Sequence, residues 1–515
     1  MRNLSAFSVV FVSFAAASGA AGCFFNYADD CELNPNLPCF WQGAGGTGAS
    51  GGAGGGGTTT IDPGCVPSNT TTPVDDECGK FVSSGSEGKD TNPGTKEKPF
   101  ATIEKALGAA TGKPIYLCAE TFTEAVIIGG GALVYGGLDC ATDWKYVGST
   151  KPSELTATAD QIPLRVGAKK NIELYDVTIR AADAMQKGGS SIALLAEAGA
   201  EVTLSHCTVE AGNGANGADG EPFVDAAMAG EVGANGGEAC SASSVDGPEG
   251  PLNGCGDVDS IGGTAGSGGV NSGSDGSNGQ PDGAMNRGIG EGGAVCTEGT
   301  VGNNGADGSP GDGATTPGTL EAAAGFVGSA GADGKPGSTA QGGGGGGGAK
   351  GGTLANQCTA GSAGGASGGS GASGGCGGGG GKGGAAGGAS IAIVSLDAKL
   401  TFAGDVTITT KAGGKGGNGG AGQLGGDGGI GGKAGPKDSA SGLNDACKGG
   451  DGGDGGPGGR GGGGLGGHSI GIAHKGTAPS MEGATITAGT AGNGGTGEGA
   501  TGNGEPGEAE KVLSF

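Results

Sequence analysis

The chain has 515 residues, and 134 of them are glycine, about a quarter of the total against roughly 7% in an average protein. Aromatic residues make up only 4%, so large apolar cores can form only in the parts that are poor in glycine. The 27 basic and 52 acidic residues give a net charge of −25, which excludes a basic face for nucleic acid. We therefore expect no nucleic-acid partner.

Residues 1–22 have the pattern of a signal peptide. Arg2 precedes an apolar run over residues 4–17, which is shorter than the roughly 20 residues that span a bilayer. The following Ala20-Ala21-Gly22-Cys23 resembles the lipobox of bacterial lipoproteins, except that leucine is usual at the place of Ala20. The resemblance implies that Cys23 is diacylated and that the exported chain is anchored to the cell envelope, at the outer membrane or cell surface. The alternative is a plain signal peptide that leaves Cys23 as a free thiol.

Fourteen cysteines suit an oxidising, exported location. If Cys23 carries lipid, thirteen remain, which allows at most six disulfides and leaves one thiol over. The sequence has no Cys-x-x-Cys spacing and only three histidines, at positions 206, 468 and 474. We expect disulfides, and no metal site or cofactor.

Residues 23–76 are rich in Gly, Ser, Thr and Pro, which predicts a flexible, lipid-anchored linker. A folded region then begins at residue 77. Ile103, Ala106, Leu107 and Ala110 have helical spacing, and Gly112 to Pro114 should end that helix. Five short strand-like runs follow without another helix, at residues 115–118, 125–128, 132–135, 172–174 and 177–179. Such a succession predicts a parallel β-solenoid.

Three stretches of this region, residues 88–107, 122–126 and 135–137, resemble the N-terminal part of pectate-lyase-like right-handed β-helix proteins. With Gly137-Leu138-Asp139-Cys140-Ala141-Thr142-Asp143-Trp144 behind a lipobox, the chain looks like a group of myxobacterial surface lipoproteins. The resemblance implies an all-β fold, a right-handed parallel β-helix with a short N-terminal capping helix, whose first coils cover residues 77–211.

Cys118 and Cys140 lie 22 residues apart, close to the length of one such coil. Stacked strands are about 4.8 Å apart, within the Cα separation that a disulfide accepts. We therefore propose this pair as a disulfide.

A repeat of Gly-Gly-x-Ser-Ile begins at Gly188, Gly387 and Gly466, and a Thr-Val or Thr-Ile pair follows each serine by 17, 17 and 16 residues. Each repeat then runs into glycine-rich sequence. We expect coils at residues 388–412 and 466–515, with residues 212–387 and 413–465 inserted between coils as glycine-rich loops. Ile192, Ile391 and Ile470 should then stack as an inward ladder.

The first glycine-rich block repeats Gly-Ala-Asp-Gly-x-Pro from Gly217, Gly305 and Gly331, which suggests tight turns. The second has glycine pairs at three-residue spacing, the period of a polyproline-II-like helix. This part resembles the glycine-rich domains of PE-PGRS proteins. Packed, polyglycine-II-like chains and disorder both remain open, because such segments bury little apolar area.

Two histidines invite a catalytic interpretation. Residues 467–471 partly resemble the histidine motif of polygalacturonases, but His468 takes the place of Ser190 and Ala389 in the sister repeats, and no paired aspartates accompany it. We expect an exposed turn histidine. His206 precedes Cys207, but neighbouring strand residues face opposite sides, so Cys207 is expected to be structural.

The sequence thus favours a non-enzymatic, lipid-anchored surface protein that displays glycine-rich segments for adhesion, with no catalytic residues. Its expected partners are the membrane and extracellular polysaccharide or envelope components. The alternative is a carbohydrate-binding or polysaccharide-degrading β-helix protein.

Overall fold

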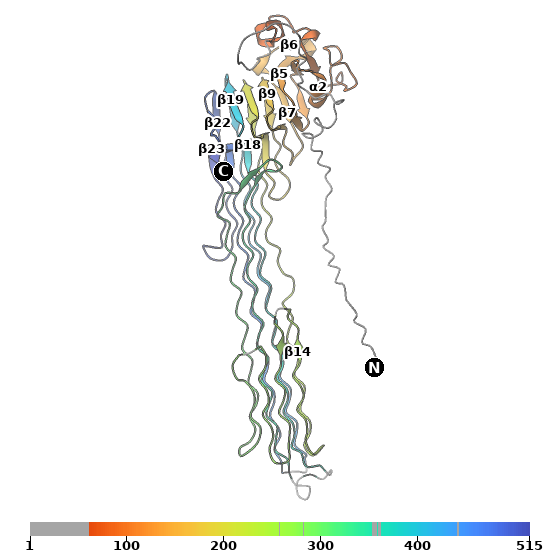
Figure 1. Ribbon diagram of the computed structural model, residues 1–515, viewed down its shortest axis with the longest axis vertical. Helices are drawn as coiled ribbons and strands as arrows, with labels where there is room; N and C mark the ends of the chain where they lie inside the picture. The colour runs from red at the N-terminus through yellow and green to blue at the C-terminus, as the bar shows by residue number, and fades with distance from the viewer. Residues whose placement is uncertain (1–60, 257, 282, 353–357, 359–361, 440–441) are drawn as a thin grey trace, which may run out of the picture. The chain divides into compact units, whose positions relative to one another are not determined.

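The computed structural model describes residues 61–256, 258–281, 283–352, 358, 362–439 and 442–515. Most of the regular structure lies in three parallel sheets (Figure 1). The main path of sheet 1 is β1 (Lys80–Val82), β2 (Ile115–Cys118), β5 (Ala132–Asp139), β9 (Asn171–Tyr175), β12 (Glu201–Ser205) and β19 (Lys399–Ala403). The short strand β6 (Lys145–Tyr146) pairs with β5 in the antiparallel sense.

Sheet 2 consists of β3 (Thr121–Thr123), β7 (Ser153–Thr156), β10 (Val177–Arg180), β13 (Thr208–Glu210), β20 (Val406–Thr409) and β22 (Ala484–Thr487). Sheet 3 consists of β4 (Val126–Ile128), β8 (Leu164–Val166), β11 (Ser191–Ala196), β18 (Ser390–Leu396), β21 (Ser469–Lys475) and β23 (Ala509–Ser514). Two antiparallel hairpins lie in the first glycine-rich block, β14 (Leu252–Asn253) with β15 (Ser260–Ile261), and β16 (Thr319–Glu321) with β17 (Gly325–Val327).

The expected fold class, an all-β right-handed parallel β-helix with projecting glycine-rich loops, is wrong. The described strands form three separate parallel sheets and not a closed solenoid, because sheet 1 ends at β19 while sheets 2 and 3 continue to β22 and β23. The glycine-rich blocks are not free loops either. They are extended chains whose backbones hydrogen-bond to one another over most of their length.

The main core lies between the inward faces of the sheets, and alternation along each strand fills it. In sheet 1 the buried columns are Ile172, Val202 and Leu400 at one position and Leu174, Leu204 and Phe402 two residues on. An apolar side chain of this size contributes about 1.5–3 kcal/mol when it is buried. These columns hold the strands in register, because a shift by one residue would expose them.

The single α-helix among the described residues, α2 (Ile103–Ala109), covers one end of this core with Ile103 and Ala106. Thr102 caps its first turn by accepting the amide hydrogen of Lys105, and the Glu124 carboxylate accepts those of Ile103 and Glu104. The helical spacing in the sequence predicts this element correctly. The described residues also contain five short 3-10 helices: η1 (Pro63–Cys65), η2 (Pro67–Asn69), η3 (Asp76–Cys78), η4 (Cys140–Thr142) and η5 (Gly148–Thr150).

Residues 61–76, which the sequence assigns to the linker, pack as part of the folded unit. Cys65 and Cys78 form a disulfide, Val74 is buried, and the Tyr116 hydroxyl donates to the carbonyl oxygen of Cys65. No helix in the described part of the chain is long and apolar enough to cross a membrane.

The repeat of Gly-Gly-x-Ser-Ile marks adjacent strands, as expected. Ile192, Ile391 and Ile470 occupy the same register position in β11, β18 and β21. The ladder does not belong to the main core, however. It lies in a second apolar cluster, where Leu320 and Phe326 of the β16–β17 hairpin cover it. Leu194, Ile393 and Ile472 form the ladder of sheet 3 that packs into the main core.

Candidate binding surface on the glycine-rich array

The proposed site residues have different outcomes. Cys23 lies outside the described residues. Cys118, at the end of β2, forms a disulfide with Cys140, which follows β5, with their Cα atoms 5.6 Å apart. Three further disulfides join distant parts of the glycine-rich blocks: Cys240–Cys358, Cys255–Cys376 and Cys296–Cys447. Together with Cys65–Cys78 they fit an exported protein.

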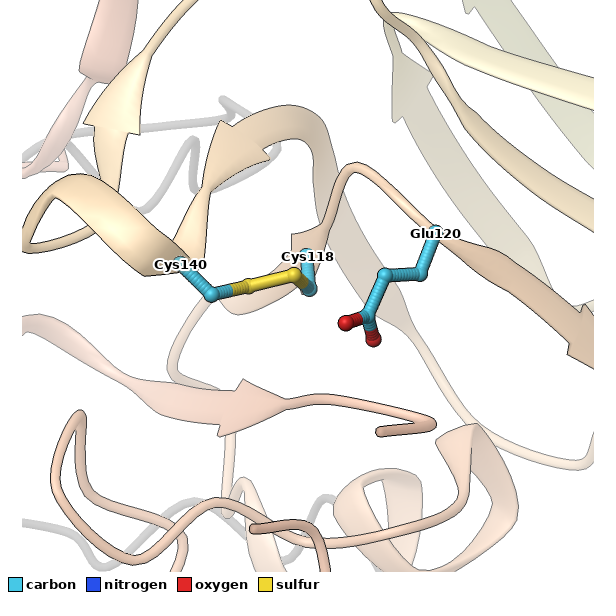
Figure 2. Close-up of side chains that lie close together, drawn as sticks. All are labelled: Cys118, Glu120 and Cys140. Carbon is cyan, nitrogen blue, oxygen red and sulfur yellow. A yellow bond between two sulfur atoms is a disulfide. The ribbon is translucent and has the colours of Figure 1, made fainter. Parts of the chain in front are cut away.

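Figure 2 shows Glu120 beside the Cys118–Cys140 disulfide, a cluster that offers three potential metal ligands within 4.8 Å of one another. Metals bind the thiolate form of cysteine, and both sulfur atoms here are oxidised. The Glu120 carboxylate also accepts hydrogen bonds from the Ser83 and Ser84 hydroxyls and the Gly85 amide. The cluster is therefore a structural junction, and we assign no metal to it.

Cys207 is the free cysteine of the described residues, and it is structural, as expected. Its thiol is buried and lies within hydrogen-bonding distance of the carbonyl oxygens of Leu174 and Ser205. Burial raises the pKa of this thiol to about 12. At neutral pH it is protonated, so it has no nucleophilic character beside the exposed His206.

His468 is not the exposed turn residue that the sequence suggested, because it is 1% exposed. Its Nδ1 accepts the amide hydrogen of Glu508, so Nε2 donates to the carbonyl oxygen of Pro317 at 2.7 Å. The rings of Phe326 and Phe515 pack against it, and burial lowers its pKa. A histidine with both nitrogens occupied and no acidic pair beside it is a structural element.

The glycine-rich segments associate into what we call the glycine-rich array: residues 212–239, 263–280, 297–314, 331–351, 366–388, 411–436, 447–467 and 489–507. Neighbouring chains are linked at every third residue, as in Gly378 to Gly456, Gly381 to Gly459 and Gly384 to Gly462. This repeat is that of polyproline II, which has three residues per turn. Of the two states that the sequence left open, the structure shows the packed one (Figure 1).

Each chain inside the array is hydrogen-bonded to several neighbouring chains at once. Along residues 371–373 three successive amides donate to three different chains, at the carbonyl oxygens of Gly263, Gly450 and Glu231. Residues 366–388 of the first block also run beside residues 411–436 and 447–467, which belong to the second block or flank it. The two blocks thus form one array and not two independent flaps. Backbone hydrogen bonds help to offset the ordering entropy.

Glycine is required inside the array because the chains lie too close for a side chain. A Cβ atom on Gly375 would overlap the carbonyl oxygen of Gly426, and one on Gly381 would overlap that of Gly420. The same overlap with a neighbouring backbone recurs throughout the array. The glycine content is therefore a packing requirement.

Asparagine and aspartate side chains of one chain accept hydrogen bonds from backbone amides of the neighbouring chain. Asn213, Asn216 and Asp219 accept hydrogen bonds from the amides of residues 412, 415 and 418. Asp219 and Asp333 belong to the Gly-Ala-Asp-Gly-x-Pro repeats, which the sequence analysis assigned to turns; they lie in extended chains instead. Hydrogen bonds from the Lys382 ammonium, which has the larger effect, and from the Gly383 amide lower the pKa of the Asp333 carboxyl. Sequence reasoning missed this role, although the three-residue spacing of Asn213, Asn216 and Asp219 was a visible signal.

Six large apolar side chains on two adjacent chains of the array remain exposed. Ala227 and Gly233 of one chain donate to the carbonyl oxygens of Leu424 and Ile430 of the other, so the two chains run side by side. We call the exposed set the apolar strip: Phe223, Val224, Met228, Val232, Leu424 and Ile430. Val224 is 94% exposed and Leu424 69%, and groups of exposed apolar side chains can mark interaction sites. The apolar strip is the strongest candidate for a functional surface.

Comparisons with protein-family models, with curated proteins and with solved structures find no match for this chain.

Proposed function

We propose that this exported protein is a non-catalytic surface protein whose glycine-rich array presents the apolar strip for adhesion to other envelope or matrix components. The observation that carries the proposal is the apolar strip itself, fixed on chains that are hydrogen-bonded at three-residue intervals. A rigid backbone lowers the entropy lost on binding, and burial of the exposed apolar side chains supplies the driving force.

Lipid attachment at Cys23 belongs to the same proposal. A diacylated N-terminal cysteine holds a protein stably at a membrane, because each buried methylene contributes about 0.8 kcal/mol. The chain between Cys23 and the first described residue, Ile61, would serve as the tether. Labelling with a fatty-acid analogue in a bacterial lipoprotein-processing host should mark the wild type and leave Cys23→Ser unmarked.

Carbohydrate recognition has less support. Binding of sugar rings by stacking needs exposed aromatic faces, but Tyr116, Tyr135 and Trp144 are buried in the core. Tyr135 stacks between Tyr116 and Tyr175 along sheet 1, and the Tyr146 hydroxyl donates to the Asp176 carboxylate. These aromatic residues stabilise the sheets and are not placed as a sugar platform.

Adhesion tests the proposal directly. Beads coated with the soluble chain should be retained under flow on isolated cell envelopes, and the combined change of Val224, Met228, Leu424 and Ile430 to Ser should abolish retention. Met285 and Val301 are also exposed but lie outside the strip, so changing both to Ser is the matched control. Retention by the fourfold variant equal to wild type, or release of sugar from an envelope polysaccharide by the wild type, would refute the proposal.

A further inference from the structure

At the C-terminal end, sheet 1 stops one strand before sheet 2 and two strands before sheet 3. After β21 the chain reaches β22 through residues 476–483, which form no strand, so nothing pairs with the outer edge of β19. In the previous repeat the corresponding stretch between β18 and β20 contains β19 itself. An unpaired edge in a sheet is a template for a further strand.

The direction of the free backbone groups follows from the pairing of β19 with β12. The Lys399 amide donates to the carbonyl oxygen of Ala200, and the carbonyl of Ala403 accepts the His206 amide. Because backbone groups alternate along a strand, residues 399, 401 and 403 bond to β12. The amides of Leu400 and Phe402 and the Leu400 carbonyl therefore point to the free edge, where the described part of the chain offers them no backbone partner, whereas the Phe402 carbonyl lies against the backbone of Gly483.

A groove of about 750 Å³ lies on this edge, between β19 and residues 477–483. A strand rises about 3.3 Å per residue, with roughly 4.8 Å to its neighbour strand and about 10 Å to the next layer, so it fills roughly 160 Å³ per residue. The groove thus has room for about five residues, and β19 itself has 5.

The columns of sheet 1 define the side chains that would fit. Leu400 and Phe402 end two apolar columns, so the next strand needs apolar residues two apart. On the outward face of sheet 1, Lys399 of β19 lies opposite Glu201 of β12, and its ammonium pairs with the Glu201 carboxylate at 3.6 Å. An acidic residue should precede the first apolar one. Asp397 and Glu482 also line the groove, which disfavours a strand with several acids.

We propose that the edge of β19 binds an extended segment of another exported protein as an additional parallel strand, with the pattern acidic, apolar, polar, apolar. Backbone hydrogen bonds to Leu400 and Phe402 supply affinity, and the two apolar columns and Lys399 select the sequence. This is a second binding site, separate from the apolar strip.

The test uses a fluorescent peptide with the sequence of residues 200–205, which occupies the same place one strand earlier. Binding to the full chain, followed by fluorescence anisotropy, should be saturable. In the proposed register the amide of the peptide's threonine donates to the Leu400 carbonyl, whereas the amides of its valine and leucine point away. N-methylation of the threonine should weaken binding at least tenfold, and N-methylation of the valine and the leucine should change it little.

Lys399→Glu tests the same contact from the side of the protein, and it changes an exposed side chain. It should weaken the acidic peptide about three- to fivefold and strengthen a peptide that begins with lysine by a similar factor, as expected for a directly opposed charge pair. Equal effects of the two N-methylation patterns would overturn strand addition. Self-association of the chain through this edge, with no displacement by the peptide, would assign the site to a second copy instead and would also overturn the proposal. Neither result bears on adhesion by the apolar strip.

Discussion

A single methyl group inside the glycine-rich array should be strongly destabilising. At Gly375 the added Cβ atom would overlap the carbonyl oxygen of Gly426 on the neighbouring chain, so Gly375→Ala must push the two chains apart. The Gly375 amide bonds to Gly453, its carbonyl accepts the Ala340 amide, and Gly426 bonds to the carbonyl of Cys376. Separation of the chains therefore strains three hydrogen bonds at once.

The magnitude follows from these contacts. Loss of two of these bonds costs about 1 kcal/mol each, and insertion of a methyl group into a packed interior costs about 1–3 kcal/mol. The free energy of unfolding should fall by about 3–5 kcal/mol. The higher helix propensity of alanine offers no compensation, because the chain is extended here.

Calorimetry on the oxidised, full-length chain measures this effect. The melting temperature of Gly375→Ala should drop by several degrees. Gly293 is exposed and has no atom within 4 Å of a Cβ at its position, so Gly293→Ala should melt within about one degree of wild type. Equal melting temperatures for the two variants would refute the argument that glycine is required for close packing of the chains.

Three further predictions concern single side chains. Asn216→Leu should accelerate hydrogen exchange at the Lys415 amide several-fold, because it removes the acceptor of that amide. Asn216→Asp keeps an acceptor oxygen and should leave the exchange rate unchanged. Identical exchange in both variants would count against a protective hydrogen bond from the Lys415 amide to the Asn216 side chain. Burial lowers the folded-state pKa of His468, so the unfolded chain takes up its proton first as pH falls below about 6.5, and the wild type should lose stability between pH 7.5 and 5.5. The loss of stability should be smaller in His468→Gln. If the melting temperatures of the wild type and this variant fell equally over that pH range, the prediction would be wrong. Because the pKa of the Cys207 thiol is raised to about 12, iodoacetamide at pH 8 should modify it only after unfolding, which mass spectrometry can follow; rapid labelling of the native chain would show that the thiol is not buried.

Local patterns in the sequence predict local structure well. The helical spacing from Ile103 gives α2, and the Gly-Gly-x-Ser-Ile repeats give the register of β11, β18 and β21 across intervening segments of very different length. These features depend on side chains that alternate or recur within a few residues, so they are legible without knowledge of distant neighbours.

The partners of the glycine-rich chains could not be read in the same way. One Gly-x-x repeat fits many neighbours equally well, so the sequence does not specify that residues 371–373 bond to residues 263, 450 and 231. Disulfide connectivity is likewise not deducible from cysteine positions, as Cys296–Cys447 illustrates. The burial of His468 depends on the β16–β17 hairpin, which lies more than 140 residues earlier in the chain.

Hydrogen exchange of the glycine-rich segments tests the central claim most directly. Mass spectrometry on the oxidised, full-length chain should resolve peptides from residues 212–239, 366–388, 411–436 and 447–467. An ordered array predicts that about half of the amides of residues 212–239 are protected for minutes or longer, with a larger share in residues 366–388, whose successive amides donate to different chains. Complete exchange of these peptides within seconds, at the rate of unstructured glycine-rich chains, would contradict the array and remove the support for an adhesive strip built on it.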